Sequence, residues 1–250
     1  MRQETPRKER FVTMLELLNI KKDYPAGDGV VNALKGIDLQ FRKSEFVSIL
    51  GQSGCGKTTL LNIIGGIDSS FTGDLLYNGK NVKHKLHAYR RKNVSFIFQN
   101  NHFLNWLTPI QNVSISKYFK SIFKGYTYNE KVEYSCDKIS SLSHGQRGYL
   151  SYLRAFFCDK DIIVADEVTG AMDNNSATVL MDHLKHLSKD RLIILVSHDL
   201  SLIGAYCDEI YYIKDGYIDN HVIKNKIDYV NRDKEKIHRS LFPLLQLSHM

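Results

Sequence analysis

The 250-residue sequence has no run of about 18 apolar residues, and no apolar stretch follows its charged N-terminus. We therefore expect neither a membrane-spanning helix nor a signal peptide. The four cysteines are scattered without a C-x-x-C pair, which argues against a disulfide framework and against a zinc ribbon. Apolar residues make up 43% of the chain, enough to fill a core. The sequence predicts a globular protein with free thiols in a reducing cytosol.

Acidic residues are missing from the stretch Lys80 to Lys92, which carries six Lys or Arg, and the whole chain has a formal charge of +7. A basic chain favours an anionic partner, which can be nucleic acid, nucleotide or an acidic membrane surface. No aromatic ladder or nucleic-acid module accompanies the basic stretch. We interpret it as a solvated face, or one turned toward anionic lipid, in preference to a nucleic-acid groove.

Alternating apolar and polar residues predict strands over Met14 to Lys21 and Leu34 to Phe41, joined through a turn at Pro25 to Gly29, as an antiparallel edge sheet. Nearly unbroken apolar runs predict buried strands, and helical periods alternate with the last three of them, which indicates a parallel sheet with crossover helices. The runs are 46–50, 94–98, 162–165, 192–196 and 210–213, and the helices are 57–65, 176–187 and 200–206. The fold class is therefore α/β. Between Val113 and Leu142 the period changes, and we expect a small helical subdomain.

A glycine-rich segment follows the first of these buried strands and opens a predicted helix: Gly51-Gln52-Ser53-Gly54-Cys55-Gly56-Lys57-Thr58. Such a turn exposes backbone N–H groups at a helix N-terminus, where the helix dipole also favours anions, so it cradles phosphates. Lys57 would reach the β and γ phosphates of a nucleotide, and the Thr58 hydroxyl would ligate Mg²⁺. The nucleotide-binding residues predicted here are Gly51, Ser53, Gly54, Cys55, Gly56, Lys57, Thr58 and Thr59.

Asp166 and Glu167 follow the apolar run 162–165, and Asp166 lies 109 residues after Lys57. Asp166 would hold Mg²⁺ through water, since this ion keeps much of its hydration and takes one or two carboxylates. Glu167 would face the γ-phosphate and orient or deprotonate the attacking water. Alone, an Asp-Glu pair after an apolar run is a weak signal. Its spacing from the glycine-rich segment makes it a strong one.

The pentapeptide Leu142-Ser143-His144-Gly145-Gln146 lies 24 residues ahead of Asp166. With the glycine-rich segment and the Asp-Glu pair, it makes the chain resemble the nucleotide-binding subunit of an ATP-binding cassette (ABC) transporter, over roughly Met14 to Asp219. The resemblance implies a RecA-like P-loop NTPase core with a parallel sheet, an antiparallel β subdomain and a shortened α-helical subdomain at about 108–158. It also implies a cassette over 14–220, an N-terminal extension over 1–13, and a charged tail over 221–250 that would either pack on the domain or lead into a permease.

The resemblance gives roles to residues that carry little signal alone. His198 would contact the γ-phosphate, Gln99 would sense Mg²⁺ and water, and Tyr24 would stack on adenine. Outside the family pattern these residues would be a surface histidine, a strand-end amide and a packing aromatic. Asp173, which closes the segment after the Asp-Glu pair, joins the nucleotide-binding set.

The pentapeptide implies that two copies of the chain act together. In this family its serine and backbone amides bind the γ-phosphate of ATP held by the opposite subunit. Ser143, Gly145 and Gln146 would therefore complete a partner's site in an ATP-bound homodimer. His144 replaces the usual first glycine of the motif, and we expect it to be tolerated with a weaker shared site.

Cys55 is a residue that the family pattern does not require. A thiol in a helix N-terminal turn, near Lys57, should have a depressed pKa and raised reactivity. We therefore expect alkylation of Cys55 to block ATP binding, the alternative being a small residue that fills a small space.

Segments 33–39 and 59–68 resemble the branch of the family that contains macrolide and peptide exporters and lipoprotein-release ATPases. The implied function is hydrolysis of ATP with Mg²⁺, coupled to a transmembrane permease that exports or extracts a peptide, drug or lipoprotein-like substrate. The chain would lie peripheral to the membrane, on its cytoplasmic face, without nucleic acid.

Two alternatives remain open. A soluble cassette ATPase acting on nucleic acid or ribosomes would explain the basic charge, but such proteins usually join two cassettes or carry long insertions, and this chain has one cassette. A catalytically weak scaffold module would explain His144, but it should lose Lys57, Glu167 or His198, and all three are present.

Overall fold

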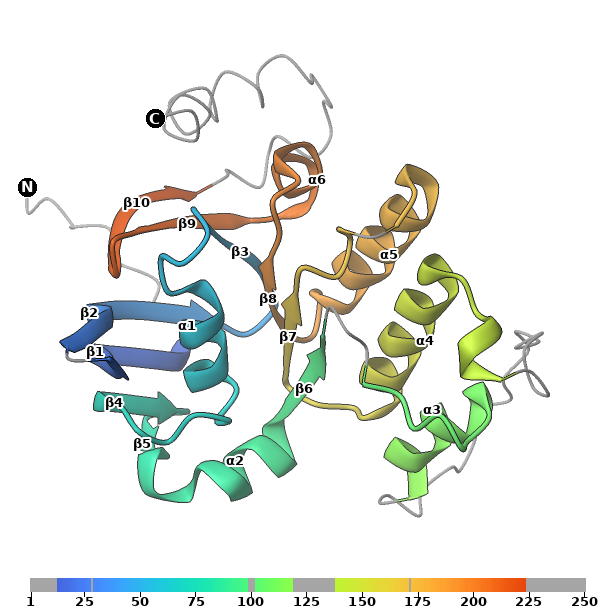
Figure 1. The fold of residues 1–250 in the computed structure, drawn as a ribbon, viewed down its shortest axis with the longest axis horizontal. Helices are drawn as coiled ribbons and strands as arrows, with labels where there is room; N and C mark the ends of the chain where they lie inside the picture. Colours follow the sequence, from blue (N-terminus) through green and yellow to red (C-terminus); the bar gives the residue numbers. More distant parts are fainter. Residues whose placement is uncertain (1–12, 28, 99–101, 119–137, 171, 224–250) are drawn as a thin grey trace, which may run out of the picture.

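The computed structural model describes residues 13–27, 29–98, 102–118, 138–170 and 172–223. Within these residues the strands form one sheet of six and one of four, with helices packed around them (Figure 1). The elements are β1 (Thr13–Ala26), β2 (Gly29–Arg42), β3 (Glu45–Gly51), α1 (Lys57–Ile64), β4 (Thr72–Tyr77), β5 (Lys80–Asn81), α2 (Leu86–Asn93), β6 (Val94–Ile97), α3 (Pro109–Tyr118), α4 (His144–Phe157), β7 (Ile162–Asp166), α5 (Asn174–Leu187), β8 (Leu192–Val196), α6 (Leu200–Tyr206), β9 (Glu209–Lys214) and β10 (Tyr217–Ile223).

The six-stranded sheet has the order β10-β9-β3-β8-β7-β6, and its strands from β9 to β6 are parallel. Only β10 is antiparallel, paired with β9 as a hairpin. All five residues of the central strand β8 are buried, which is why it reads as an unbroken apolar run. The predicted parallel sheet is confirmed, and the five predicted buried strands match β3, β6, β7, β8 and β9 within one residue at each end.

Alternate residues of the central strands face two different cores, because side chains along a strand point to opposite faces. Val47 and Ile49 of β3 pack with α1 and the four-stranded sheet. Phe46 and Leu50 of the same strand pack with α4, α5 and α6. The sheet therefore separates α1 from α4 and α5, and this separation governs which site residues can meet within one chain.

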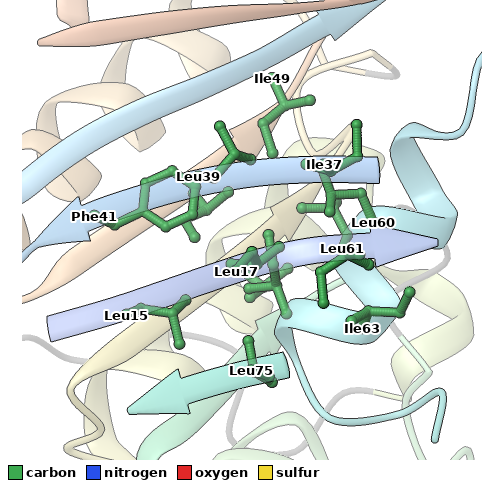
Figure 2. Close-up of a cluster of buried hydrophobic side chains, with 14 of the residues drawn as sticks. Leu15, Leu17, Ile37, Leu39, Phe41, Ile49, Leu60, Leu61, Ile63 and Leu75 are labelled. Atoms are coloured by element: carbon green, nitrogen blue, oxygen red, sulfur yellow. The ribbon is translucent and has the colours of Figure 1, made fainter. Parts of the chain in front are cut away.

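The four-stranded sheet has the order β2-β1-β4-β5 and is antiparallel throughout. Its inward side chains, such as Leu15, Leu17 and Leu75, pack with Leu61 of α1 (Figure 2). The predicted edge sheet is confirmed, but β1 and β2 each run for 14 residues, well beyond the predicted strands. The hairpin carries Tyr24 to the end of the ladder, where it pairs with Val31.

The helical part begins with α3, which packs against α4. The buried side chain of Asn112 fixes the segment before α3, since it donates to the carbonyls of Leu104, Leu107 and Thr108. Residues 119–137, a part of the predicted helical subdomain that lies between α3 and α4, are outside the described residues, as are 1–12 and 224–250 of the predicted extensions. No helix in the described part of the chain is long and apolar enough to cross a membrane.

Candidate nucleotide-binding and catalytic site

The glycine-rich loop joins the end of β3 to the start of α1. Gly54 and Gly56 have φ values of +79° and +107°, in the left-handed region that L side chains rarely adopt. The loop also packs closely on its neighbours. A Cβ added to Gly51 would lie 2.4 Å from the carbonyl oxygen of Ile213, and one added to Gly56 would lie 2.6 Å from that of Ala33. The glycines therefore allow the loop to lie directly against β2 and β9.

Lys57 occupies the first position of α1, and its side chain folds back into the loop. Nζ donates hydrogen bonds of 2.7 Å to the carbonyl oxygens of Gly51 and Gln52, and the residue is only 7% exposed. Within the described residues the ammonium has carbonyl partners and no carboxylate partner. The first turn of α1 contains no acidic residue, so the positive end of the helix dipole is not neutralised. With Thr58 exposed at the next position, this helix end fits a chain of phosphates.

Asp166 and Glu167 lie at the carboxyl end of β7, beside the end of β8. Asp166 is paired in register with Val196, and the N–H of Glu167 donates to the Val196 carbonyl at 2.8 Å. The backbone of Glu167 has a φ of +47°, an uncommon value for a residue other than glycine. Its carboxylate lies 2.6 Å from Nε2 of His198, which follows β8. The two predicted catalytic side chains are therefore held together, and they remain 29% and 59% exposed.

The electrostatics of Asp166 link this strand end to the loop. Burial raises the pKa of the Asp166 carboxyl and Glu167 raises it further, whereas Lys57 and His198 lower it. A cation beside this carboxylate would favour its ionised form. In the described part of the chain no cluster of three or more His, Cys, Asp or Glu side chains could hold a metal. Mg²⁺ would then depend on Asp166, Thr58, phosphate oxygens and water, its usual set of ligands, so the residues present fit the ion.

Tyr24 lies near α1 at the end of the β1–β2 hairpin and is 37% exposed. Its hydroxyl lies 3.5 Å from Thr59 Oγ1 and 3.4 Å from Asp68 Oδ2, and the Lys22 ammonium lies 4.8 Å from its ring centroid. Lys22 and Asp68 form a largely buried ion pair of 2.8 Å that braces the ring. Sequence reasoning missed both, because no motif links residues 46 positions apart.

The pentapeptide forms the N-terminus of α4. The hydroxyl of Ser143, the N-cap, accepts from the Gln146 N–H at 3.2 Å, and Gln146 Oε1 accepts from the Ser143 N–H at 2.8 Å, which completes a capping box. Gly145 packs on α5, where an added Cβ would lie 2.8 Å from Ser176 Oγ. Asp173 caps α5 by accepting from the N–H and hydroxyl of Ser176, and these bonds lower the pKa of its carboxyl. The helix starts of α4 and α5 therefore form one unit.

This unit stands apart from the phosphate-binding loop. α4 and α5 lie across the six-stranded sheet from α1 (Figure 1). Among the described residues, no hydrogen bond or ion pair joins Ser143, Gly145 or Gln146 to the loop. The side chain of His144 is exposed, so it fits at this helix start without displacing a neighbour. The predicted metal ligand Gln99 lies outside the described residues.

The structure contradicts the expectation for Cys55. Burial raises the pKa of its thiol, and this effect outweighs the lowering by Lys57 and by backbone N–H groups. The predicted depressed pKa is therefore wrong, because the sequence does not reveal how far the thiol is buried. Cys55 lines a hollow of about 440 Å³ between β2, loop residues 52–55 and residues 212–216, which are the end of β9 and the turn after it. Neither Glu167 nor His198 lines this hollow, so it is separate from these two catalytic groups.

The known proteins that are similar to this chain support the interpretation of the site as a nucleotide-binding site. The family model for ABC transporters matches residues 34–170. The chain is 36% identical over 222 residues to the bacitracin export ATP-binding protein BceA of Halalkalibacterium halodurans, covering 83% of this chain and 87% of that protein. It is 34% identical over 238 residues to the macrolide export ATP-binding/permease protein MacB of Psychrobacter cryohalolentis, covering 89% of this chain but only 34% of MacB.

Solved structures agree with this assignment. The ATP-binding cassette MJ0796, in a dimeric post-hydrolysis state bound to ADP and Pi, matches with a TM-score of 0.76 and 29% identity, over 84% of this chain and 98% of that one. MJ0796 is a protein of Methanocaldococcus jannaschii. The family match covers more than half of the chain and includes both the glycine-rich loop and the Asp-Glu pair. The chain belongs to the ABC transporter family, and its enzymatic activity is the hydrolysis of ATP.

Proposed function

We propose that Lys57, Thr58, Asp166, Glu167 and His198 carry out this hydrolysis. Lys57 exchanges its two loop carbonyls for the β and γ phosphates of ATP, which the loop and the N-terminus of α1 surround. Thr58 and Asp166 hold Mg²⁺, which when bound supplies positive charge that stabilises the phosphates. The nearness of Asp166 to Lys57 supports this assignment, because the Lys57 ammonium opposes the rise in the pKa of the Asp166 carboxyl and therefore lies close to it.

Glu167 acts as the general base. Its carboxylate takes a proton from water as the water oxygen bonds to the γ-phosphorus and the bond from that phosphorus to the departing ADP oxygen breaks. His198, at 2.6 Å, orients the Glu167 carboxylate and reaches toward the γ-phosphate. Tyr24, braced by Lys22 and Asp68, lies beside α1 and stacks on the adenine.

The site is completed by a second copy of the chain. The observation that carries this proposal is the position of the α4 N-terminus, which lies across the sheet from the loop. Within the described residues, no hydrogen bond or ion pair joins the two. A capped helix start with an exposed Ser143 suits a phosphate. The dimeric state of MJ0796 bound to ADP and Pi supports a dimer here, in which we place two MgATP between the two cassettes.

The hydrolysis drives a transmembrane permease. The names of the relatives support this proposal, since BceA is described as an export ATP-binding protein and MacB as an ATP-binding/permease protein. In this proposal the cassette spans 14–220 and lies on the cytoplasmic face of the membrane. The transported substrate is a peptide, a drug or a lipoprotein-like molecule.

The test uses the full chain with MgATP and compares wild type with Glu167→Gln. Loss of the general base should lower the hydrolysis rate by about 10²- to 10⁴-fold. ATP should remain bound, and a dimer should accumulate in size-exclusion chromatography. Asp190→Asn is the matched control, since it removes an exposed carboxylate far from the loop and should leave the rate unchanged.

Two results would count against the proposal. Undiminished hydrolysis by Glu167→Gln would remove this residue as the base. A variant that binds MgATP, fails to turn it over and stays monomeric would contradict the shared site. In that case His144→Gly would show whether the histidine in the pentapeptide is the cause, because a dimer restored by glycine assigns the defect to position 144.

A further inference from the structure

The positive charge of the chain is concentrated in one segment. Residues 75–129 contain nine Lys or Arg and no Asp or Glu. The rest of the chain has 25 basic and 27 acidic residues, so its formal charge is −2, although the whole chain has +7. The described part of this segment includes α2, β6 and the start of the helical part, and α2 and α3 lie along the same lower edge of the molecule (Figure 1).

The inner side of α2 is fixed to the core. Leu86 and Tyr89 are buried, and the Tyr89 hydroxyl donates to the Ile64 carbonyl at 2.9 Å. Two of the cations also serve the fold. Arg90 donates to the Gly66 carbonyl, and Lys83 donates to the Gly73 carbonyl, both at 2.9 Å. These contacts hold α2 in one orientation.

Four cations remain exposed on the outer side, and we call them the basic face: Lys80, Lys85, Arg91 and Lys92. Within the described residues none of the four forms an ion pair. The exposed side chains of His84 and His87 lie among them. A surface with charges of one sign and no ion-pair partner favours an anionic partner.

The helix dipole does not account for the basic face. Basic residues in a last turn stabilise a helix by interacting with its terminal carbonyls. At α2 a distant side chain already has that role, because Lys160 Nζ donates to the carbonyls of Arg91 and Lys92. The side chains of Arg91 and Lys92 are left pointing to solvent.

An exposed tryptophan belongs to the same acid-free segment. Trp106 is 80% exposed, although Asn112 fixes the residues around it. The backbone around Trp106 is therefore fixed, and its side chain stands on the surface. Tryptophan is enriched at membrane–water interfaces, and clusters of Lys and Arg bind anionic lipid headgroups. Proteins that bind single-stranded nucleic acid stack its bases on exposed aromatic side chains among the cations, whereas Tyr89, the aromatic residue of α2, is buried.

We propose that the basic face docks on anionic phospholipid headgroups of the membrane that surrounds the permease. The proposal rests on the proposed function, which places the cassette at a membrane. The contact adds an attraction that does not depend on the permease, and it holds α2 and the neighbouring helical part toward the lipid surface. Salt should weaken it, since exposed charges are screened.

The test measures co-sedimentation of the full chain with vesicles of pure phosphatidylcholine or with about 30% phosphatidylglycerol. Wild type should bind the anionic vesicles only. The triple variant Lys85→Gln, Arg91→Gln, Lys92→Gln should bind them about 100-fold more weakly, because each basic residue near an anionic surface contributes roughly a factor of five. The matched control carries Lys21→Gln, Lys43→Gln and Lys189→Gln, three exposed lysines elsewhere, and should retain most of the binding.

Equal losses in the two triple variants would overturn the proposal, because net charge alone would then explain binding. Equal binding of wild type to neutral vesicles would also overturn it. A parallel titration with a short DNA duplex tests nucleic acid as the partner. If wild type bound DNA but not the vesicles, and the first triple variant bound DNA more weakly, the basic face would be assigned to nucleic acid. ATP hydrolysis by the same preparations tests the proposed function separately, since wild type that fails to hydrolyse ATP contradicts that function and leaves the vesicle result intact.

Discussion

Two clusters of similar composition lie at opposite edges of the six-stranded sheet. Each contains two carboxylates, one histidine and one permanently basic side chain. The carboxyl-edge cluster follows β7 and β8 and consists of Asp166, Glu167, His198 and Lys57. The amino-edge cluster lies at the starts of β3 and β9 and consists of Glu45, Glu209, His221 and Arg42. Composition alone therefore does not distinguish a catalytic site from a structural one.

The clusters differ in how fully their groups are paired. At the amino edge Glu45 and Glu209 are only 4% and 5% exposed, and Arg42 contacts both. Glu209 Oε2 also accepts from the Tyr211 hydroxyl at 2.9 Å and lies 3.0 Å from His221 Nε2. These bonds tie β2, β3, β9 and β10 together.

The carboxyl edge is open by comparison. In the described residues the Asp166 carboxylate has no hydrogen-bond partner, and Glu167 has one short contact, to His198. Glu167 also has an uncommon backbone conformation, with φ of +47°. Carboxylates with few partners beside a glycine loop leave room for a ligand, whereas fully paired carboxylates stabilise the fold. The comparison predicts that substitutions at the two edges have opposite effects on stability and catalysis.

The largest effect on stability should come from Glu209→Ala. This change leaves the Tyr211 hydroxyl and His221 without their acceptor and removes one of two carboxylates from Arg42. Losing one partner of a buried pair costs about 3–5 kcal/mol. We expect about 3 kcal/mol in the free energy of unfolding, because Arg42 remains 37% exposed and keeps Glu45. Urea unfolding followed by circular dichroism measures this loss.

Glu167→Gln gives the contrast to that variant. Its free energy of unfolding should change by less than about 0.5 kcal/mol, while its rate of ATP hydrolysis should fall sharply. Glu209→Ala should keep its turnover number at temperatures where it stays folded. If Glu209→Ala lowered the turnover number of the folded protein by more than tenfold, the amino edge would not be purely structural.

A smaller loss should follow Gly56→Ala in the loop. The new methyl would need φ of +107° and would approach the Ala33 carbonyl to 2.6 Å. Strain of this kind costs about 1–3 kcal/mol, and we expect about 2 kcal/mol with loss of ATP binding. Gly54→Ala is the matched control, because its φ is +79° but nothing lies within 4 Å of an added Cβ. It should cost about 1 kcal/mol. Equal losses would mean that backbone conformation, and not close packing, requires glycine at position 56.

The sequence alone predicted the core of the fold well. Strands such as Leu192–Val196 are apolar on both faces, so their pattern is unambiguous. The ends of β1 and β2 were missed because polar residues there, such as Asp23 and Asn32, pair across the hairpin without an apolar face. Helix α2 was not predicted, because it lies in the basic stretch and only Leu86 and Tyr89 mark its inward face.

The site was predictable where motifs carry it and not where burial decides. The glycine loop and the Asp-Glu pair have fixed spacing, so their residues could be named in advance. The brace of Tyr24 by Lys22 and Asp68 depends on a contact across 46 positions, which no local pattern reveals. The thiol of Cys55 was misjudged for the same reason, because burial raises its pKa in spite of the adjacent Lys57.

The smallest and most diagnostic effect should come from Asp166→Asn. The pKa of Asp166 is raised in the folded chain by burial and by Glu167, so the folded state binds the proton more tightly than the unfolded state does. Ionisation of this carboxyl therefore destabilises the fold near neutral pH, and that cost disappears as the pH falls through the raised pKa. Without nucleotide, Asp166→Asn should be more stable than wild type at neutral pH by up to about 1 kcal/mol, with hydrolysis lost.

The stability gain should shrink toward zero as the pH falls below the usual range for aspartate, because both chains then carry a neutral side chain at position 166. Thermal unfolding across this pH range measures the difference. Asp190→Asn, at an exposed carboxylate, should show no such pH-dependent gain. A destabilised Asp166→Asn at neutral pH would mean that this carboxylate has a stabilising partner, and the two edges of the sheet would then differ in exposure but not in their role in the fold.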